Sequence, residues 1–252
     1  MDVDLRLPDG ADDILLLEAG PPDLGLALSL IARVVHRVDG APLDPTALPI
    51  GDVDVLLLRL RQRVIGEVVS AEEVCAGPGC RARVDITFSI DAYLEHHRPG
   101  DAPPILPAEE GWYRLSDDAV EFRLPRAADQ LAIARAEWPE QALLLRCLRP
   151  AEIADPARRK VEAAMEAMAP SLCAELEGIC PECGARVEAS FDPIQYTLRE
   201  LRDQAAFVYE EVCAIAHHYH WSEAEILSLP AARRARYAEL AAPRAAPERT
   251  TA

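Results

Sequence analysis

Apolar residues recur along the chain with the period of a helix in some segments and with the period of a strand in others. Residues 24–35 and 52–65 repeat their apolar positions at helical spacing, and Gly66 follows the second run as a stop signal. The pattern predicts further helical segments over residues 127–136, 140–148 and 157–168. It therefore indicates a chain that is largely helical.

Strand-like alternation appears beside two pairs of cysteines. After the turn Cys75-Ala-Gly-Pro-Gly-Cys80, residues 82–90 alternate apolar and polar side chains, which is the period of a half-buried strand. The run Cys180-Pro-Glu-Cys183-Gly is followed by the same alternation. We expect two hairpins with a cysteine pair at each tip, which amount to a weak internal repeat.

The C-terminal part of the chain has the most regular pattern. Asp192 and Pro193 supply a helix N-cap and a first-turn proline. The apolar residues that follow are spaced alternately by four and by three, which predicts one long helix with a heptad seam. The residues of this seam are Ile194, Leu198, Leu201, Ala205, Val208, Val212, Ile215 and Tyr219. Beyond it, Ser222 and Glu225 have the spacing of a capping box that begins another helix.

These patterns predict an α+β fold that is mainly helical. In this fold the two cysteine-tipped β-hairpins form a zinc-ribbon-like unit, and the long heptad helix lies near the C-terminus. The expected segments are 1–47, acidic and partly helical; 48–100, a helix and the first cysteine hairpin; 101–170, a proline-containing loop or linker at 101–107, a hairpin at 111–125 and helices; 171–241, the second cysteine hairpin and the C-terminal helices; and 242–252, a flexible tail.

Composition narrows the range of partners. The 252 residues include 26 Lys and Arg against 43 Asp and Glu, so the formal net charge is −17. This charge disfavours sequence-independent binding to nucleic acid or to anionic lipid, because both need a basic surface. The sequence has no apolar run long enough to cross a membrane and no signal peptide at Met1. We expect a cytoplasmic protein whose partners are neither nucleic acid nor membrane.

The paired cysteines are the most informative chemistry in the sequence. A thiolate pair on a tight turn offers two soft ligands for Zn²⁺, and two such turns complete a tetrahedral site. We therefore predict one structural zinc per chain, bound by Cys75, Cys80, Cys180 and Cys183. Free structural thiols are the first alternative. A redox-active pair is the second, although a redox Cys-x-x-Cys would precede a helix rather than a strand.

The remaining candidate residues have simpler interpretations. Cys147, Cys173 and Cys213 are expected to be buried thiols. Cys213, His217 and His220 share one helical face and form a rival metal site, although solvated imidazoles beside a thiol are the more common case. The cluster Arg233, Arg234 and Arg236 is either helix C-terminal charge or a contact for an acidic partner.

No motif in the sequence supports catalysis. There is no glycine-rich phosphate loop, no Gly-x-Ser-x-Gly and no His-Glu-x-x-His. Adjacent acids such as Glu109 and Glu110 are ordinary in solvated turns. We expect no enzyme and assign no catalytic residues.

Several motifs together resemble a known family. They are Cys180-Pro-Glu-Cys-Gly, Phe191-Asp-Pro and Trp221-Ser-Glu-Ala-Glu-Ile-Leu, with Leu48-Pro-Ile-Gly-Asp and Val120-Glu-Phe-Arg-Leu-Pro earlier in the chain. These segments resemble the baseplate-hub assembly proteins of T-even-type contractile phage tails and their relatives in tail-derived extracellular injection systems. The likeness covers most of residues 48–241. The first cysteine turn departs from the family's Cys-Pro-x-Cys-Gly form by two extra residues.

The resemblance implies a non-enzymatic assembly factor or structural component of a baseplate, with other tail proteins as partners. A zinc-ribbon regulator that binds nucleic acid is the alternative, and the acidic charge disfavours it. A zinc hydrolase would need an open coordination position and a nearby base. The sequence leaves open the oligomeric state and whether the protein stays in the finished particle.

Overall fold

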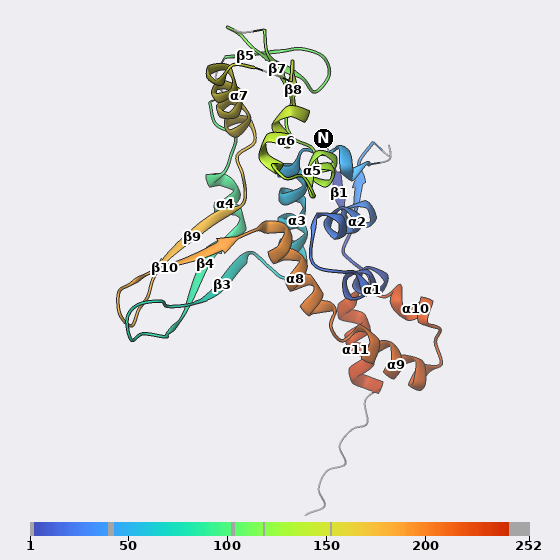
Figure 1. Cartoon of the computed structure of the whole chain (residues 1–252). Helices are drawn as coiled ribbons and strands as arrows, with labels where there is room; N and C mark the ends of the chain where they lie inside the picture. The colour runs from blue at the N-terminus through green and yellow to red at the C-terminus, as the bar shows by residue number, and fades with distance from the viewer. Residues whose placement is uncertain (1–2, 40–42, 102–103, 118, 152, 242–252) are drawn as a thin grey trace, which may run out of the picture.

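The computed structural model describes residues 3–39, 43–101, 104–117, 119–151 and 153–241. It contains a helical body, a small four-stranded sheet with its own helix, two long hairpins and a group of C-terminal helices (Figure 1). The mixture of helices with small antiparallel sheets confirms the predicted combination of helix and strand.

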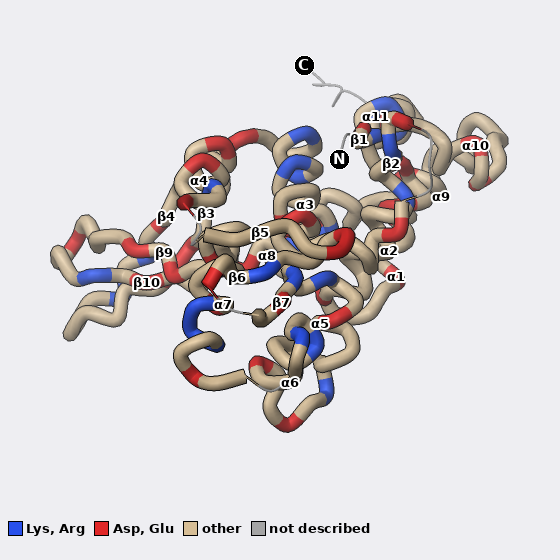
Figure 2. The backbone as a smooth tube through the Cα atoms, turned by 90° about the horizontal axis from the view of Figure 1, so that it is seen from above, with Lys and Arg blue, Asp and Glu red and all other residues tan. Residues whose placement is uncertain are grey.

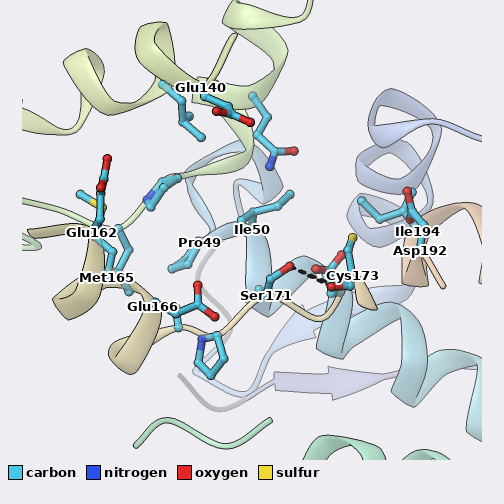
Figure 3. Close-up of a pocket in the computed structure, with 18 residues that line it drawn as sticks. Pro49, Ile50, Glu140, Glu162, Met165, Glu166, Ser171, Cys173, Asp192 and Ile194 are labelled. Atoms are coloured by element: carbon cyan, nitrogen blue, oxygen red, sulfur yellow. Dashed lines mark hydrogen bonds between the residues drawn. The ribbon is translucent and has the colours of Figure 1, made fainter. Parts of the chain in front are cut away.

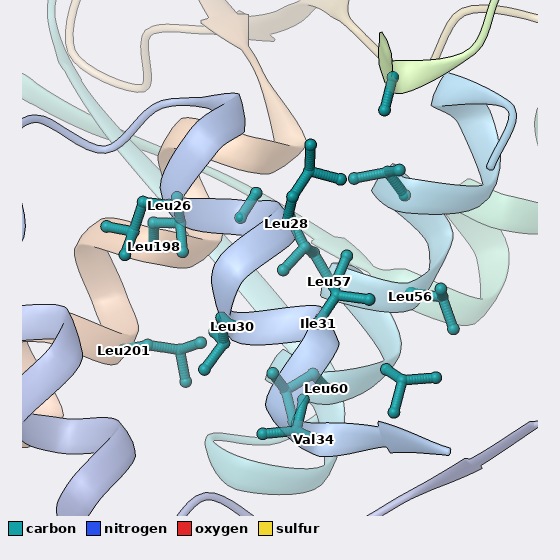
Figure 4. Packing of buried hydrophobic residues seen from close by; sticks show 14 of the residues in the cluster. Leu26, Leu28, Leu30, Ile31, Val34, Leu56, Leu57, Leu60, Leu198 and Leu201 are labelled. Atoms are coloured by element: carbon teal, nitrogen blue, oxygen red, sulfur yellow. The ribbon is translucent and has the colours of Figure 1, made fainter. Parts of the chain in front are cut away.

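The helical body is built from four helices whose apolar faces meet. They are α1 (Gly10–Glu18), α2 (Leu24–Val34), α3 (Ile50–Val64) and α8 (Pro193–Ala205). A two-stranded sheet of β1 (Val3–Leu5) and β2 (Val35–Arg37) and the 3₁₀ turn η1 (Pro45–Ala47) lie at its edge. Leucines predominate in the core (Figure 4), whose buried members include Leu26, Leu30, Ile31, Val34, Leu57, Leu60, Leu198 and Leu201. The predicted helices at 24–35 and 52–65 are confirmed as α2 and α3.

The middle of the chain forms a second apolar cluster. Strands β5 (Ile105–Pro107), β6 (Tyr113–Leu115), β7 (Glu121–Phe122) and β8 (Leu148–Arg149) make an antiparallel sheet. Helix α7 (Asp155–Met168) packs its apolar face on this sheet. Helices α5 (Ala127–Ile133) and α6 (Pro139–Arg146) connect the sheet to the body. The stretch 101–107, predicted as a loop or linker, ends in β5 instead, because it pairs with β6.

The two cysteine hairpins are confirmed and lie side by side (Figure 1). The first consists of β3 (Val68–Val74) and β4 (Arg83–Ser89), and α4 (Ile90–His96) follows it. The second consists of β9 (Ala174–Ile179) and β10 (Arg186–Phe191), and α8 follows it. We call β3–β4–α4 the first hairpin–helix unit and β9–β10–α8 the second.

The predicted long C-terminal helix is wrong, because the structure divides it. Helix α8 ends at Ala205, and α9 (Val208–Tyr219) begins after Ala206 and Phe207. Apolar residues of α8 pack in the helical body, whereas α9 packs against α11 (Ala231–Ala241). Phe207 lies at the break with its side chain 68% exposed. The heptad spacing therefore serves two separate packing surfaces.

The final helices are joined to the body by a buried arginine. The capping box of Ser222 and Glu225 is confirmed at the start of α10 (Glu223–Leu227). On α11, Arg234 is buried and donates hydrogen bonds to Asp13 of α1 and Glu211 of α9. The predicted basic face is therefore reduced to Arg233 and Arg236, which are exposed. The predicted flexible tail at 242–252 lies outside the described residues.

Candidate metal centre

The tip of the first hairpin presents its two cysteines on a short loop between β3 and β4. Cys75 remains in the ladder, since its amide donates to the carbonyl of Ala82 at 2.9 Å. The Cys80 amide donates to the carbonyl of Gly77 at 3.0 Å, which closes the turn. Gly79 has a φ of +73°, a backbone conformation that glycine adopts without a steric penalty. The loop thus points both thiols toward the other hairpin.

The second hairpin uses a shorter turn for the same purpose. The Cys180 amide donates to Ala185 at 2.8 Å, and the Gly184 amide donates back to the Cys180 carbonyl at 2.9 Å. Gly184 has a φ of +72°, equivalent to that of Gly79. The turn lies between two strands, which differs from the strand-to-helix setting of redox Cys-x-x-Cys pairs.

The structure brings all four predicted cysteines together. Their Sγ atoms lie within 4.8 Å of one another. Cys75 Sγ lies 3.6 Å from Cys183 Sγ, and Cys80 Sγ lies 3.8 Å from Cys180 Sγ. Each hairpin therefore pairs its first cysteine with the second cysteine of the other hairpin. Four thiols in this arrangement can hold a metal ion.

The environment of the cluster is closed on one side by apolar residues. Cys75 and Cys180 are 2% and 1% exposed and pack with Val84 and Val187, whereas Cys183 is exposed. Burial raises the pKa of Cys180, but the amides of Cys183 and Glu182 and the neighbouring thiols outweigh it and lower that pKa to about 7. A first thiolate is thus available near neutral pH, and thiolate is the form that binds metal.

One glycine is required by the close approach of the two hairpins. A Cβ atom on Gly77 would lie 3.0 Å from Cys183 Sγ and 3.2 Å from Ala185 Cβ. The Gly77 amide also donates to Cys75 Sγ at 3.3 Å, which stabilises negative charge on that sulfur. The longer first loop therefore folds over the cluster because it carries no side chain at this position.

The other candidate thiols and imidazoles do not join a site. Cys147 is buried as predicted, but Cys173 and Cys213 are exposed, so the prediction of buried thiols is wrong for these two. Cys173 precedes β9 at the edge of a cleft, and Cys213 lies on the solvent side of α9. Within the described residues, Cys213, His217 and His220 do not form a ligand group, and His220 caps α9 in a left-handed conformation.

The base of the two hairpins is joined by aromatic residues whose contact with one another the sequence analysis did not predict. Phe88 and Phe191 meet edge to face with ring centroids 5.0 Å apart. The Tyr93 hydroxyl, in the first unit, donates to the Leu172 carbonyl beside the second at 2.7 Å. The Tyr196 hydroxyl, in the second unit, donates to the Ser70 carbonyl of the first. These exchanged contacts hold the hairpins in register below the cysteines.

A comparison of the two units within the sequence would have found these residues. When Cys80 is aligned with Cys183, both are followed by an Ala-Arg-Val run and then by an aromatic position, Phe88 or Phe191. The same alignment pairs Tyr93 with Tyr196. Val84 and Val187 are each 5% exposed in equivalent places. The repeat is therefore present in the structure as well as in the amino-acid sequence.

Comparisons with protein-family models, with curated proteins and with solved structures gave no match. Among the helices of the described ranges, none combines the length and the apolar character needed to cross a membrane.

Proposed function

We propose that the four cysteines bind one structural zinc ion, and that the chain is a non-enzymatic assembly protein of a contractile injection baseplate. The observation that carries the first part is the convergence of four Sγ atoms from two hairpins within 4.8 Å. The second part rests on the motif resemblance and on the acidic charge.

The two shortest separations between sulfurs match those expected around zinc. A tetrahedral site with Zn–S bonds of about 2.3 Å has sulfurs about 3.8 Å apart, and the two closest pairs here are 3.6 and 3.8 Å apart. All four positions would be filled by cysteines, so no position would remain for water or substrate. Such a site stabilises a fold and supports no hydrolysis.

Metal analysis tests the zinc. Purified protein should contain one zinc per chain, and the double variant Cys180→Ser/Cys183→Ser should contain none. The variant Cys213→Ser is the matched control, because it removes an exposed cysteine from outside the cluster. A folded wild-type protein without metal, or with iron in the site, would overturn the assignment to zinc.

The assembly role is supported by several motifs taken together. The resemblance covers both cysteine turns, the capped helix at Ser222 and most of the chain between them. A net charge of −17 favours protein partners over nucleic acid. The zinc would then fix two hairpins whose exposed sides remain available for such partners.

Deletion of the gene in the producing cell tests this role. We expect sheath and tube to accumulate without complete baseplates, as seen by electron microscopy, and the wild-type gene to restore complete particles. Normal particles in the deletion strain would contradict the proposal. Mass spectrometry of purified particles would then show whether the protein remains in them.

The nucleic-acid regulator has less support. Acidic residues outnumber basic ones on the strands of both hairpins (Figure 2), where Glu72, Asp85, Glu175, Glu177 and Glu188 are exposed. The exposed arginines of the same strands, Arg83 and Arg186, are each ion-paired with a glutamate. A ribbon that contacts phosphates needs a surplus of arginine and lysine over acids on such a surface. Binding of a random duplex that weakens steeply with salt would favour the regulator instead.

A further inference from the structure

A cleft of about 540 Å³ lies where the N-terminal turn of α3 meets α6, α7 and the start of α8 (Figure 3). Its walls come from segments far apart in the sequence, and the cysteine cluster is not among them. Ile50, Leu143, Met165 and Ile194 give it apolar surface. The cleft is therefore a separate feature of the molecule, which the zinc proposal does not use.

The charged residues of this cleft all have the same sign. Its lining includes five carboxylates, those of Asp54, Glu140, Glu162, Glu166 and Asp192, and among the described residues no lysine, arginine or histidine lines it. Glu140, Glu162 and Glu166 are exposed on α6 and α7, and Asp192 and Ile194 lie across from them (Figure 3). We call this feature the acidic cleft.

Asp54 is the unusual member of the acidic cleft. Its side chain is only 6% exposed, yet it has no hydrogen-bond or ion-pair partner among the described residues. A buried carboxylate without a partner is costly, and proteins normally supply one. By contrast, Glu162 pairs with Arg158 at 2.8 Å, and Asp192 accepts a hydrogen bond from the Gln195 amide at 3.0 Å. Asp54 therefore has no polar partner within the described residues, and the cleft beside it has room for one from outside the chain.

We propose that the acidic cleft binds a segment of a partner protein that presents an arginine or lysine next to an apolar residue. The cationic head would reach Asp54, and the apolar neighbour would contact Ile50, Met165 and Ile194. Charge complementarity argues for this occupant, since every charged group of the lining is an acid. The inference rests on the proposed function, for which it supplies the chemistry of one partner contact.

The shape of the acidic cleft favours a side chain over a bare metal ion. A divalent cation needs several oxygens at about 2.0–2.6 Å from one point, and the carboxylates here do not converge into a ligand group within the described residues. A long basic side chain can bury its aliphatic stem against apolar walls while its head reaches a charge. The aliphatic stem would suit the apolar walls of the acidic cleft, and the charged head would suit the buried Asp54.

Titration of ¹⁵N-labelled full-length protein with a capped leucine–arginine–leucine tripeptide tests the proposal. We expect amide shifts to concentrate at Ile50, Gly51 and Ile194. The citrulline tripeptide, which has the same shape without the charge, should bind at least about tenfold more weakly, as expected for loss of a charged hydrogen bond. Equal binding of the two peptides, or shifts spread over the surface, would overturn the proposal.

Two variants on the same helix provide a matched pair. Asp54→Asn removes the buried charge and should weaken arginine-peptide binding about tenfold, whereas Asp52→Asn removes an exposed charge outside the cleft and should change it less than about twofold. Equal losses in both variants would mean attraction by net charge alone and would overturn the inference. Shifts at these amides with calcium chloride but not with the peptide would also overturn it, in favour of a metal site. Zinc content, measured on the same samples, reports on the proposed function separately.

Discussion

The two hairpin–helix units share one plan but attach to the rest of the protein differently. Both have two cysteines at the tip, a buried valine and an aromatic residue along the second strand, and a tyrosine in the helix that follows. The first unit has the longer cysteine loop and ends in the short helix α4, capped by Ser89. The second has the shorter loop and ends in α8, capped by Asp192, whose leucines enter the main core. The shared features bind the units to each other. The second unit enters the main leucine core through α8, whereas the first packs on α3 through a separate cluster that includes Leu58, Ile90 and Tyr93.

The largest expected effect comes from breaking the cysteine cluster from either side. Because each hairpin pairs with the other, Cys80→Ser and Cys183→Ser should both abolish metal binding. Each should lower the free energy of unfolding by on the order of 5 kcal/mol, since metal binding is coupled to folding. Metal content and urea unfolding measure this, with Cys213→Ser as control. If only one variant loses the metal, the reciprocal arrangement is wrong.

Asp54, a buried acid of α3 next to the charged cap of the second unit, gives the protein a pH-dependent stability. Burial, and then the charge of Asp192, raise the pKa of Asp54 to about 7 from 3.8. The folded state thus holds a proton that the unfolded state has lost, so the free energy of unfolding should fall as pH rises through this range. Asp54→Asn should remove a fall of about 3 kcal/mol. The other titratable groups around the cleft are Tyr93, Glu140, Glu162, Glu166 and Cys173.

Replacing Asp192, the N-cap of α8, by serine, the residue that caps α4, isolates the contribution of Asp192 to the raised pKa of Asp54. Asp192→Ser gives the second unit the cap of the first, keeps a hydroxyl that can bond the Gln195 amide, and removes the charge. It should reduce the fall in stability by less than Asp54→Asn does, because burial is the larger cause. Urea unfolding at pH 4.5 and pH 8 measures both variants. An unchanged pH profile in Asp54→Asn would contradict the assignment.

The exchanged tyrosine contacts should differ in strength. Tyr93→Phe leaves the buried Leu172 carbonyl without its donor and should cost about 1–2 kcal/mol. Tyr196→Phe affects a more exposed bond to Ser70 and should cost about 0.5 kcal/mol. Thermal or urea unfolding compares them directly. Equal costs would show that the two units are more symmetric than their burial indicates.

The smallest effects are expected at the glycines of the two tips. Gly79→Ala and Gly184→Ala each force alanine into a left-handed conformation in open space and should each cost about 1 kcal/mol. Gly77→Ala differs, because its Cβ meets Cys183 Sγ, and it should weaken metal retention in a chelator competition. If Gly77→Ala holds metal as well as Gly79→Ala does, the close approach of the loops is not needed for binding.

Much of the fold could be predicted from the local pattern of apolar and polar residues. The apolar spacing of residues 24–35 and 52–65 predicted α2 and α3, and the alternation after Cys80 and Cys183 predicted the hairpins. The convergence of the cysteines was predictable because two ligands on each hairpin leave a tetrahedral site half filled. These features depend on residues near one another in the chain.

Features that depend on distant neighbours were not predictable. The heptad spacing from Ile194 to Tyr219 continues across the break at Ala206, because Ala206 keeps helical dihedral angles and neither proline nor glycine marks the place. Only the change of packing partner, from the body to α11, separates the two helices. Asp54 likewise looked like an ordinary helical acid, since its burial comes from segments that follow it by many residues.

The crossed pairing of the cysteines has a consequence for the order of events during synthesis. Cys75 and Cys183 are 108 residues apart in the chain, and Cys80 and Cys180 are 100 apart. At about 5–20 residues per second, the ribosome delivers the first pair of thiols roughly 5–20 s before the second. During that interval the first loop carries only half of the proposed ligand set, and its thiols are open to thiol-reactive compounds and to competing metals. The proposed metal site can therefore be completed only after Cys183 has been synthesised.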